Sequence, residues 1–388
     1  MALFSILQCR NRIWLAAAAA TGLSACTTVS VPPQLEAVRQ RVAADCAAGT
    51  FSGVVAVERQ GRTIFLHSCG WADAEGRTPV DPAARFKLFS ISKVFTGTTI
   101  LRLVEAGRME LDGLLSSYVP GVPAPWAGVT IRQLLQHRSG IPDHTGKLVQ
   151  AYLSGGHRSH SSAMQNVLAS LNGQETELLA QPGEVWRYSN FGYELLALAA
   201  ATRESRPFHE IVRTRLFEPA AMTMASMDLP DPDPANLRSL PTPGLIAGFN
   251  GSPGQRQIAT SYSFIQQGAG AVIASYNDLF AFARALRSGR LLSREMRARN
   301  EADAITASAT ARYGYGWMIR SVGECSYWQH SGGNNGYVSE FAMAPDAEVT
   351  IVILSNLGFV HVSDYRQELA GILLGGRGCS PVSLGEVG

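Results

Sequence analysis

Lysine is the scarcest charged residue in this chain of 388 residues. Of its 33 lysines and arginines only three are lysines, Lys87, Lys93 and Lys147, so arginine supplies almost all of the positive charge. Arginine keeps its proton inside proteins, whereas lysine can release it. A lysine kept three residues after a serine, as Lys93 is after Ser90, therefore suggests a role in proton transfer rather than charge alone.

Other common patterns are missing too. The net charge is +2 and the basic residues form no run, which gives no electrostatic case for nucleic acid as a partner. No C-x-x-C pair suggests zinc, and no metal or other cofactor is expected. No P-loop, no G-x-G-x-x-G after a strand and no G-x-S-x-G occur. Nucleotide binding and the α/β-hydrolase nucleophile elbow are therefore unsupported.

The composition is that of a globular protein. Hydrophobic residues make up 46% of the chain and charged residues 16%, which argues against disorder. A chain of 388 residues can bury a large core, and we expect two lobes.

The N-terminus is typical of an export signal. A basic start precedes the apolar stretch 13–23, which is too short to cross a bilayer. Residues 23–26 (L-S-A-C) resemble a bacterial lipobox, in which Cys26 receives lipid once a signal peptide, residues 1–25, is removed. We therefore expect a lipid-anchored protein of the cell envelope, with residues 26–34 as a tether.

The residue after the lipobox bears on localisation. In lipoproteins of this kind a residue other than aspartate there, here Thr27, indicates the outer membrane, facing the periplasm. Two alternatives stay open. A signal peptide cut near Ala25 would leave a secreted or periplasmic protein, and an uncut segment would be a membrane anchor.

Four cysteines remain when Cys9 and Cys26 are set aside. They are Cys46, Cys69, Cys325 and Cys379. An even number in an oxidising compartment indicates disulfides, for which three pairings exist. We favour Cys46 with Cys69 and Cys325 with Cys379.

The segment 88–95 contains S-x-x-K, formed by Ser90 and Lys93. This spacing is the nucleophile signature of serine enzymes that form acyl intermediates. Residues three apart on a helix share a face, so we expect the Lys93 amine beside the Ser90 hydroxyl. A serine hydroxyl becomes nucleophilic when a neighbouring base takes its proton, and a neutral lysine can be that base. S-x-x-K by itself also arises by chance.

A second motif, Y-S-N, ends at Asn190, where a helix is expected to begin. In an acyl-transfer site the phenol of Tyr188 can share the proton with Lys93, and Asn190 can hold the substrate carbonyl or amide. The alternative is that the asparagine only caps the helix that follows.

A third motif, H-S-G-G, lies at the end of a predicted strand. Its glycines, Gly332 and Gly333, would let a substrate lie along the strand edge. The backbone N–H groups of Gly333 and Ser90 are expected to form an oxyanion hole. His330 is expected to contact the substrate or to help keep Lys93 neutral. The alternative is a strand-end histidine followed by a simple turn.

The periodicity predicts an α/β sheet lobe and a mainly helical lobe. Strands are expected at 54–58, 63–67, 314–319, 327–330, 339–344 and 349–355, and helices at 35–48, 90–106, 129–137, 163–171, 191–201, 206–216 and 360–374. The early hairpin and late strands are expected to form one antiparallel sheet flanked by N- and C-terminal helices. The α/β lobe would comprise 35–107 and 265–388, with the helical lobe 108–264 inserted.

Two segments are interpreted as exposed loops. Residues 229–254 hold six prolines and several glycines, so an irregular loop that helps to set specificity is expected. His157 and His160 lie among glycines and serines and are interpreted as solvated. Glu184 is expected to support the loop before Tyr188.

The three motifs, in this order, resemble the serine β-lactamase and penicillin-binding-protein superfamily, most closely the class C-type β-lactamase-related proteins. Further matches are the stretches 134–140 (L-L-Q-H-R-S-G), 182–184, 268–270, 277–279 and 313–317. The resemblance covers nearly all of the chain after the leader. It implies the β-lactamase/D,D-peptidase fold, Ser90 as nucleophile, Lys93 and Tyr188 as the base pair, Asn190 as a substrate ligand, and no metal.

One position departs from the family pattern. Most of these proteins carry K-T-G where this chain has H-S-G, a version seen in some D,D-peptidases, D-amino-acid peptidases and related esterases. Loss of that lysine weakens the case for carboxylate binding and for an efficient β-lactamase. We expect an exported serine hydrolase acting through an acyl-enzyme on a small ester or a D-amino-acid, cell-wall peptide. The alternatives are a weak class C-like β-lactamase and a non-catalytic envelope module that binds or senses.

Overall fold

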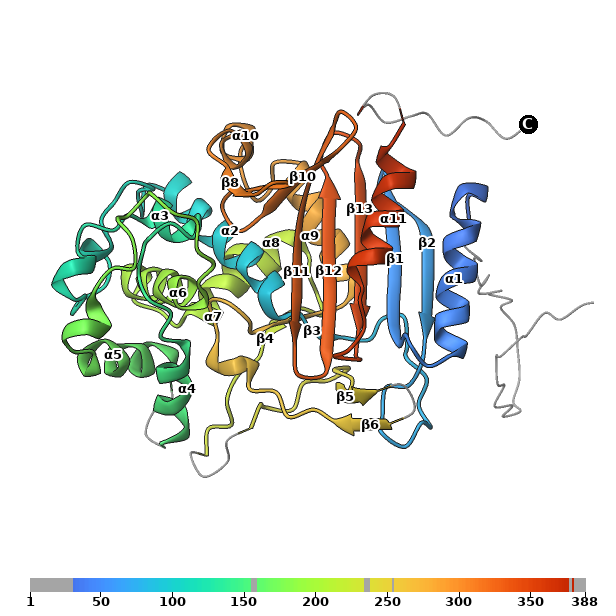
Figure 1. Cartoon of the computed structure of the whole chain (residues 1–388), viewed down its shortest axis with the longest axis horizontal. Coiled ribbons are helices and arrows are strands. Elements are labelled where there is room, and N and C mark those ends of the chain that lie inside the picture. The colour runs from blue at the N-terminus through green and yellow to red at the C-terminus, as the bar shows by residue number, and fades with distance from the viewer. Residues whose placement is uncertain (1–30, 155–158, 234–237, 253–254, 377–378, 380–388) are drawn as a thin grey trace, which may run out of the picture.

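The computed structural model describes residues 31–154, 159–233, 238–252, 255–376 and 379 (Figure 1). The predicted signal peptide and lipid-bearing Cys26 lie outside these ranges. None of the helices in the described ranges is both long and apolar enough to span a membrane.

An eight-stranded antiparallel sheet forms the centre of one half of the molecule (Figure 1). Its strand order is β2-β1-β13-β12-β11-β10-β9-β8, so the first strands of the chain lie beside the last. The strands are β1 (Gly53–Arg59), β2 (Arg62–Cys69), β8 (Ile305–Ser308), β9 (Ala311–Tyr313), β10 (Met318–Val322), β11 (Cys325–Asn334), β12 (Tyr337–Ala344) and β13 (Val349–Ser355).

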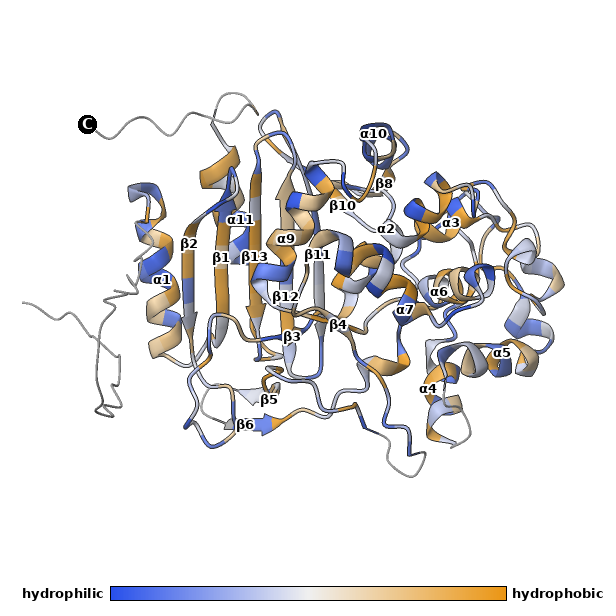
Figure 2. Ribbon diagram, turned by 180° about the vertical axis from the view of Figure 1, so that it is seen from behind, coloured by the Kyte–Doolittle hydropathy of each residue, from blue (hydrophilic) through white to orange (hydrophobic). Residues whose placement is uncertain are grey.

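Strand β1 shows how the sheet is buried on both faces. All of its residues are buried, and Figure 2 colours it as largely hydrophobic. Side chains alternate across a strand, so Val54 and Ala56 join one hydrophobic core while Val55 and Val57 join the other. A strand that contributes to two cores needs helices on both sides.

Those helices come from opposite ends of the chain. The helices α1 (Glu36–Ala47) and α11 (Ser363–Leu374) pack on one face of the sheet. On the other face α9 (Tyr276–Arg287) packs against β1 and β13. Helix α2 (Ser92–Glu105) lies beside α9, with the rings of Phe95 and Phe282 4.7 Å apart.

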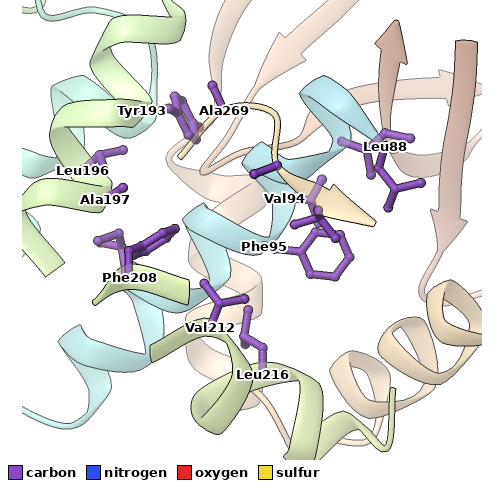
Figure 3. Packing of buried hydrophobic residues seen from close by; sticks show 14 of the residues in the cluster. Leu88, Val94, Phe95, Tyr193, Leu196, Ala197, Phe208, Val212, Leu216 and Ala269 are labelled. Carbon is purple, nitrogen blue, oxygen red and sulfur yellow. The ribbon is translucent and has the colours of Figure 1, made fainter. Parts of the chain in front are cut away.

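The other half of the molecule is mostly helical (Figure 1). The remaining helices are α3 (Ile131–Leu135), α4 (Thr145–Leu153), α5 (His160–Ser170), α6 (Asn190–Glu204), α7 (Phe208–Val212), α8 (Glu218–Ala220) and, beside the sheet, α10 (Arg294–Ala302). Two small sheets accompany them: β3 (Phe86–Lys87), β7 (Val272–Ala274) and β4 (Ser226–Met227), and β5 (Phe249–Ser252) with β6 (Gln255–Ile258). Figure 3 shows the apolar side chains that join α2 to α6 and α7.

The fold class expected from the sequence is confirmed, but one strand is shorter than expected. The predicted strand 314–319 starts only at Met318. Gly316 has φ +96°, a left-handed conformation that interrupts an extended chain. The N–H of Tyr315 donates to Asn300 Oδ1 (2.7 Å) instead of to a neighbouring strand.

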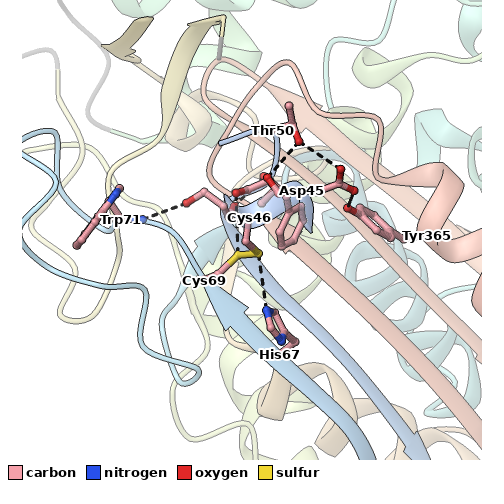
Figure 4. Close-up of a disulfide and its surroundings, with 10 residues drawn as sticks. Asp45, Cys46, Thr50, His67, Cys69, Trp71 and Tyr365 are labelled. Carbon is pink, nitrogen blue, oxygen red and sulfur yellow. Dashed lines mark hydrogen bonds between the residues drawn. A yellow bond between two sulfur atoms is a disulfide. The ribbon is translucent and has the colours of Figure 1, made fainter. Parts of the chain in front are cut away.

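Both disulfides favoured by the sequence are present in the structure. Cys46 bonds to Cys69, and Cys325 bonds to Cys379. In the described part of the chain, one group of cysteine, histidine and acidic side chains is spaced closely enough for a metal: Cys46, His67 and Cys69 (Figure 4). The disulfide occupies both sulfur atoms of that group, so it does not offer three free ligands.

The packing of α2 gives a stability prediction. Phe95 is fully buried and its ring contacts those of Phe217 (5.9 Å between centroids) and Phe282. Phe95→Ala should lower the free energy of unfolding by about 3–5 kcal/mol, because a buried aromatic ring is lost and a cavity remains. Urea titration followed by circular dichroism measures this, with Ile258→Ala, at an exposed position, as the control. A change below about 1 kcal/mol would contradict the packing described.

Candidate active site

Ser90 lies in the 3-10 turn Phe89–Ile91, immediately before α2. The sequence pattern predicts Ser90 inside the helix, but the helix starts at Ser92. The backbone of Phe89 is left-handed, with φ +45°, a conformation unusual for a residue with a side chain, and it prevents an α-helix from extending back beyond Ser90. Its ring is buried and lies 6.1 Å from that of Tyr337, which holds the turn in place.

The amine of Lys93 has three oxygen partners. Lys93 Nζ lies 3.1 Å from Ser90 Oγ, 2.7 Å from Asn190 Oδ1 and 3.2 Å from the carbonyl oxygen of Ala269. The amide and carbonyl oxygens can only accept, so Lys93 donates to both. In a neutral amine the remaining position is a lone pair, and it faces the Ser90 hydroxyl. This is the arrangement that proton transfer from serine to lysine requires.

Lys93 differs from the other lysines in its surroundings. Lys87 pairs with Asp228 at 2.8 Å. Lys147 pairs with Glu175 at 2.6 Å. Lys93 is fully buried, and within the described ranges its amine contacts oxygens of a hydroxyl, an amide and a peptide rather than a carboxylate.

Tyr188 closes the site from the helical half. Its ring centroid lies 4.7 Å from Lys93 Nζ and 4.5 Å from the ring of His137. The side chain is 37% exposed, so one part of it reaches an open cavity of about 260 Å³. The cavity is lined by Ser90, Tyr188, Met318, Gln329, His330, Ser331 and Gly333.

Asn190 is the first residue of α6, and Ser189 rather than Asn190 is the cap. The Ser189 hydroxyl accepts from the N–H of Gly192 at 3.0 Å. The alternative in which Asn190 is only a cap is therefore wrong. Asn190 Oδ1 is occupied by Lys93, which leaves its amide NH2 group to face other partners.

A chain of hydrogen bonds joins two buried histidines through Tyr313. His330 Nδ1 donates to the carbonyl of Ser331 (2.7 Å), because a carbonyl only accepts, and His137 Nδ1 accepts from the N–H of Ser189 (3.1 Å). The other nitrogens each lie 3.2 Å from the Tyr313 hydroxyl. Thus His137 donates to Tyr313, and Tyr313 donates to His330. Both ring nitrogens of His330 are engaged in hydrogen bonds. His330 would therefore have to give up one of them to contact a substrate.

Both histidines are held neutral. Burial lowers the pKa of His330 to about 3, with the nearby Lys93 acting in the same direction. Burial, then Lys93 and His330, lowers the pKa of His137 well below its usual range. Burial raises the pKa of the Tyr313 phenol that joins them. The wall of the cavity therefore carries no histidine charge near neutral pH.

The two glycines of the third motif, Gly332 and Gly333, have different structural roles. A Cβ on Gly332 would lie 1.9 Å from the carbonyl oxygen of Leu88, so only glycine lets β11 approach the turn that carries Ser90. Gly333 is exposed and lines the cavity with Ser90. The structure thus brings together Ser90 and Lys93, Tyr188 and Asn190, and the third motif, from three distant parts of the chain.

One histidine that the sequence pattern predicts to be solvated is instead buried. His160 is not solvated: it is 4% exposed and its Nε2 lies 2.7 Å from Glu194 Oε2. His157 lies outside the described residues. Met318 and Gln329 also line the cavity. No motif marked them, because their pairing across β10 and β11 is a property of the sheet register.

The loop predicted to set specificity is more regular than expected. It ends in β5, which pairs with β6. No residue of its described part lines the cavity at Ser90. Its expected influence on specificity stays a prediction. Glu184 does support its own loop, since its carboxylate accepts from the N–H of Gln181 at 3.3 Å.

Comparison with known sequences identifies relatives across most of the chain. A sequence model of the family described as Beta-lactamase matches residues 36–372. A penicillin-binding protein of Bacillus subtilis is 28% identical over 315 residues, covering 79% of this chain and 68% of that protein. The D-aminopeptidase of Cereibacter sphaeroides is 22% identical over 305 residues, covering 78% of this chain but only 56% of its own length.

Solved structures share the fold. The penicillin binding protein from Bacillus halodurans superimposes with a TM-score of 0.70 at 22% identity, covering 85% of this chain and 98% of that one. The D-amino acid amidase from Ochrobactrum anthropi SV3, solved with L-phenylalanine amide, gives 0.71 at 20% identity and covers 88% and 98%. At these identities the likeness concerns architecture alone.

The neutral histidines give a pH prediction. The pKa of His330 is about 3 in the folded chain against the ordinary 6.5, so the unfolded chain takes up the proton first as the pH falls. Stability from this group is complete above about pH 6.5 and is lost toward pH 3, by up to about 1.4 kcal/mol per pH unit. Urea titrations between about pH 6 and pH 4 should therefore show a flatter loss of stability in His330→Asn than in the wild type. The exposed His361 provides the control, and equal slopes for His330→Asn and His361→Asn would refute the assignment.

Proposed function

We propose, because the chain belongs to the Beta-lactamase family, that it is a serine hydrolase that forms an acyl-enzyme at Ser90. The observation that supports this most directly is the Lys93 amine, which donates to two fixed oxygens and presents its third position to the Ser90 hydroxyl 3.1 Å away. Relatives in the family include a D-aminopeptidase, so hydrolysis by this fold has precedent.

The proposed reaction has two halves. In the first, Ser90 Oγ attacks the substrate carbonyl carbon as its proton passes to Lys93, and the N–H groups of Ser90 and Gly333 stabilise the oxyanion. The proton then moves through Lys93 and Tyr188 to the leaving alcohol or amine, whose bond to the carbonyl carbon breaks. In the second, water attacks the ester on Ser90 and gives its proton to the same pair. The acid leaves and Ser90 regains its hydrogen.

Asn190 is proposed to orient the substrate. Its Oδ1 is fixed by Lys93 at 2.7 Å, so its NH2 group is the part able to donate to a substrate carbonyl. Because the same side chain fixes the amine, substrate contact and base placement depend on one residue.

The charge of the cavity favours a neutral substrate. None of the described residues that line it is lysine or arginine, and His330 is neutral above its pKa of about 3. A carboxylate beside the scissile bond would therefore lack the cation that K-T-G proteins supply. We propose small esters and D-amino-acid amides or peptides first, and β-lactams as weaker substrates. The choice of D-amino-acid amides and peptides agrees with the names of a D-aminopeptidase relative and a D-amino acid amidase of the same fold.

We also propose that the protein is exported and anchored by lipid on Cys26, in the outer membrane facing the periplasm. The support is the lipobox-like sequence of residues 23–26 together with two disulfides, which persist in oxidising compartments.

The catalytic assignment is tested by intact-protein mass spectrometry and by hydrolysis of p-nitrophenyl acetate, D-phenylalanine amide and a labelled penicillin. Ser90→Ala should lose the acyl adduct, and Lys93→Met, which keeps the length but not the amine, should lower turnover by about 10²–10⁴-fold. Lys147→Met, at a partly exposed ion pair, is the matched control. Adducts of equal yield on wild type and Ser90→Ala would overturn the proposal. Binding without any adduct in the wild type would instead favour the non-catalytic module.

The anchoring proposal is tested separately in cells of a Gram-negative host. The wild type should incorporate labelled palmitate and sediment with outer membranes, because the lipid chains insert into the bilayer. Cys26→Ala should take up no label and appear in the periplasm or medium. Label retained by Cys26→Ala would contradict the lipobox assignment.

A further inference from the structure

Glu194 is a fully buried carboxylate just behind the candidate active site. It lies on α6 four residues after Asn190, so the two side chains share one face of the helix. Glu194 Oε2 accepts from the N–H of Gly268 at 2.9 Å, and Oε1 accepts from the N–H of Ala269 at 2.9 Å. Its one-turn neighbour Asn190 bonds Lys93 directly.

The opposite side of the 268–269 segment is bound by α2. The carbonyl of Gly268 accepts from Thr96 Oγ1 at 2.6 Å, and that of Ala269 accepts from Lys93 Nζ at 3.2 Å. A Cβ on Gly268 would lie only 2.1 Å from the carbonyl oxygen of Tyr193, so the segment is pressed against α6. These peptide groups form a single layer between the Glu194 carboxylate and the Lys93 amine.

His160 fixes the carboxylate from the remaining side. Its Nε2 lies 2.7 Å from Glu194 Oε2 and carries the proton, since a carboxylate oxygen accepts. Both side chains are buried. The two oxygens of Glu194 thus accept from three donors. One is His160 of α5, and the other two are the N–H groups of the 268–269 segment.

We propose that Glu194, held by His160, is a positioning residue for Lys93, an inference that rests on the proposed function. The carboxylate sets the place of the Ala269 carbonyl, and that carbonyl with Asn190 Oδ1 aims the third position of the amine at Ser90. Neither Glu194 nor His160 touches the substrate.

The physical reason lies in what a neutral amide cannot do. In Glu194→Gln one oxygen becomes an NH2 group, which cannot accept from a peptide N–H. At least one buried donor then loses its partner, a loss that costs about 1–3 kcal/mol unless the segment moves. Movement of the segment carries the Ala269 carbonyl away from Lys93. A displacement of about 1 Å in such a support is enough to slow the chemistry by about 100-fold.

The experiment follows acylation by p-nitrophenyl acetate in a stopped flow, reading the nitrophenol burst and the adduct on Ser90 by mass. For Glu194→Gln we expect the acylation rate constant to fall by about 10- to 100-fold while the substrate concentration for half-maximal rate changes less than about threefold. Glu58→Gln is the matched control, because Glu58 is an equally buried carboxylate on β1 that pairs with Arg284 and Arg287, away from the cavity. It should lose stability but acylate at the wild-type rate.

Thr96→Val tests the same segment from its other side, by removing the hydroxyl that donates to Gly268, and serves if Glu194→Gln does not fold. It should also slow acylation more than substrate binding. Wild-type acylation in a folded Glu194→Gln, or in Thr96→Val if the first variant is unfolded, would overturn the positioning role and leave the proposed function standing. Failure of the wild type to acylate at all would overturn the proposed function, and the positioning role with it.

Discussion

The structure depends on how one buried amine is held without a carboxylate. Lys93 brings together the turn that carries Ser90, the first turn of α6 and the segment 268–269, each through one hydrogen bond. A buried polar group with no partner is costly, so all three segments must be in place for the amine to be satisfied. The same contacts direct the third position of the amine at the Ser90 hydroxyl. The bonds that stabilise the junction of the two halves are therefore also those on which the proposed proton transfer depends.

The charge of the site follows from its burial. His137, Tyr313 and His330 form a directed chain in which each group has one proton to give and one place to accept it. Burial keeps both imidazoles neutral, so the strand edge beside Ser90 offers hydrogen bonds and shape rather than a fixed positive charge. This distinguishes the cavity from one built around a K-T-G lysine and explains why neutral esters and amides are the substrates proposed.

The sheet fixes where these parts meet. Strand β1 pairs with β13 along its whole length, from Gly53 opposite Ser355 to Arg59 opposite Val349. This pairing places the first strands of the chain beside the last, in a sheet that has a core on each face. With β11 thus fixed in the sheet, the close contact of Gly332 with Leu88 sets the distance between the strand edge and the turn that carries Ser90. The pairing of the first strands with the last therefore constrains the geometry of the candidate site as well as stability.

Local sequence determined the parts of this protein whose physics is local. Turn chemistry and periodicity predict the hairpin at Gln60 and Gly61, the terminal helices and the S-x-x-K spacing. The disulfide pairs favoured by the sequence are also those in the structure. Family motifs also marked Tyr188, Asn190 and the H-S-G strand. The sequence did not reveal that Asn190 bonds Lys93, that Ser90 precedes its helix, or that His160 is buried on Glu194. Those facts were decided by tertiary packing. The two contacts among them join residues 97 and 34 positions apart, and no local pattern records which buried donor will meet which acceptor once the two halves pack together.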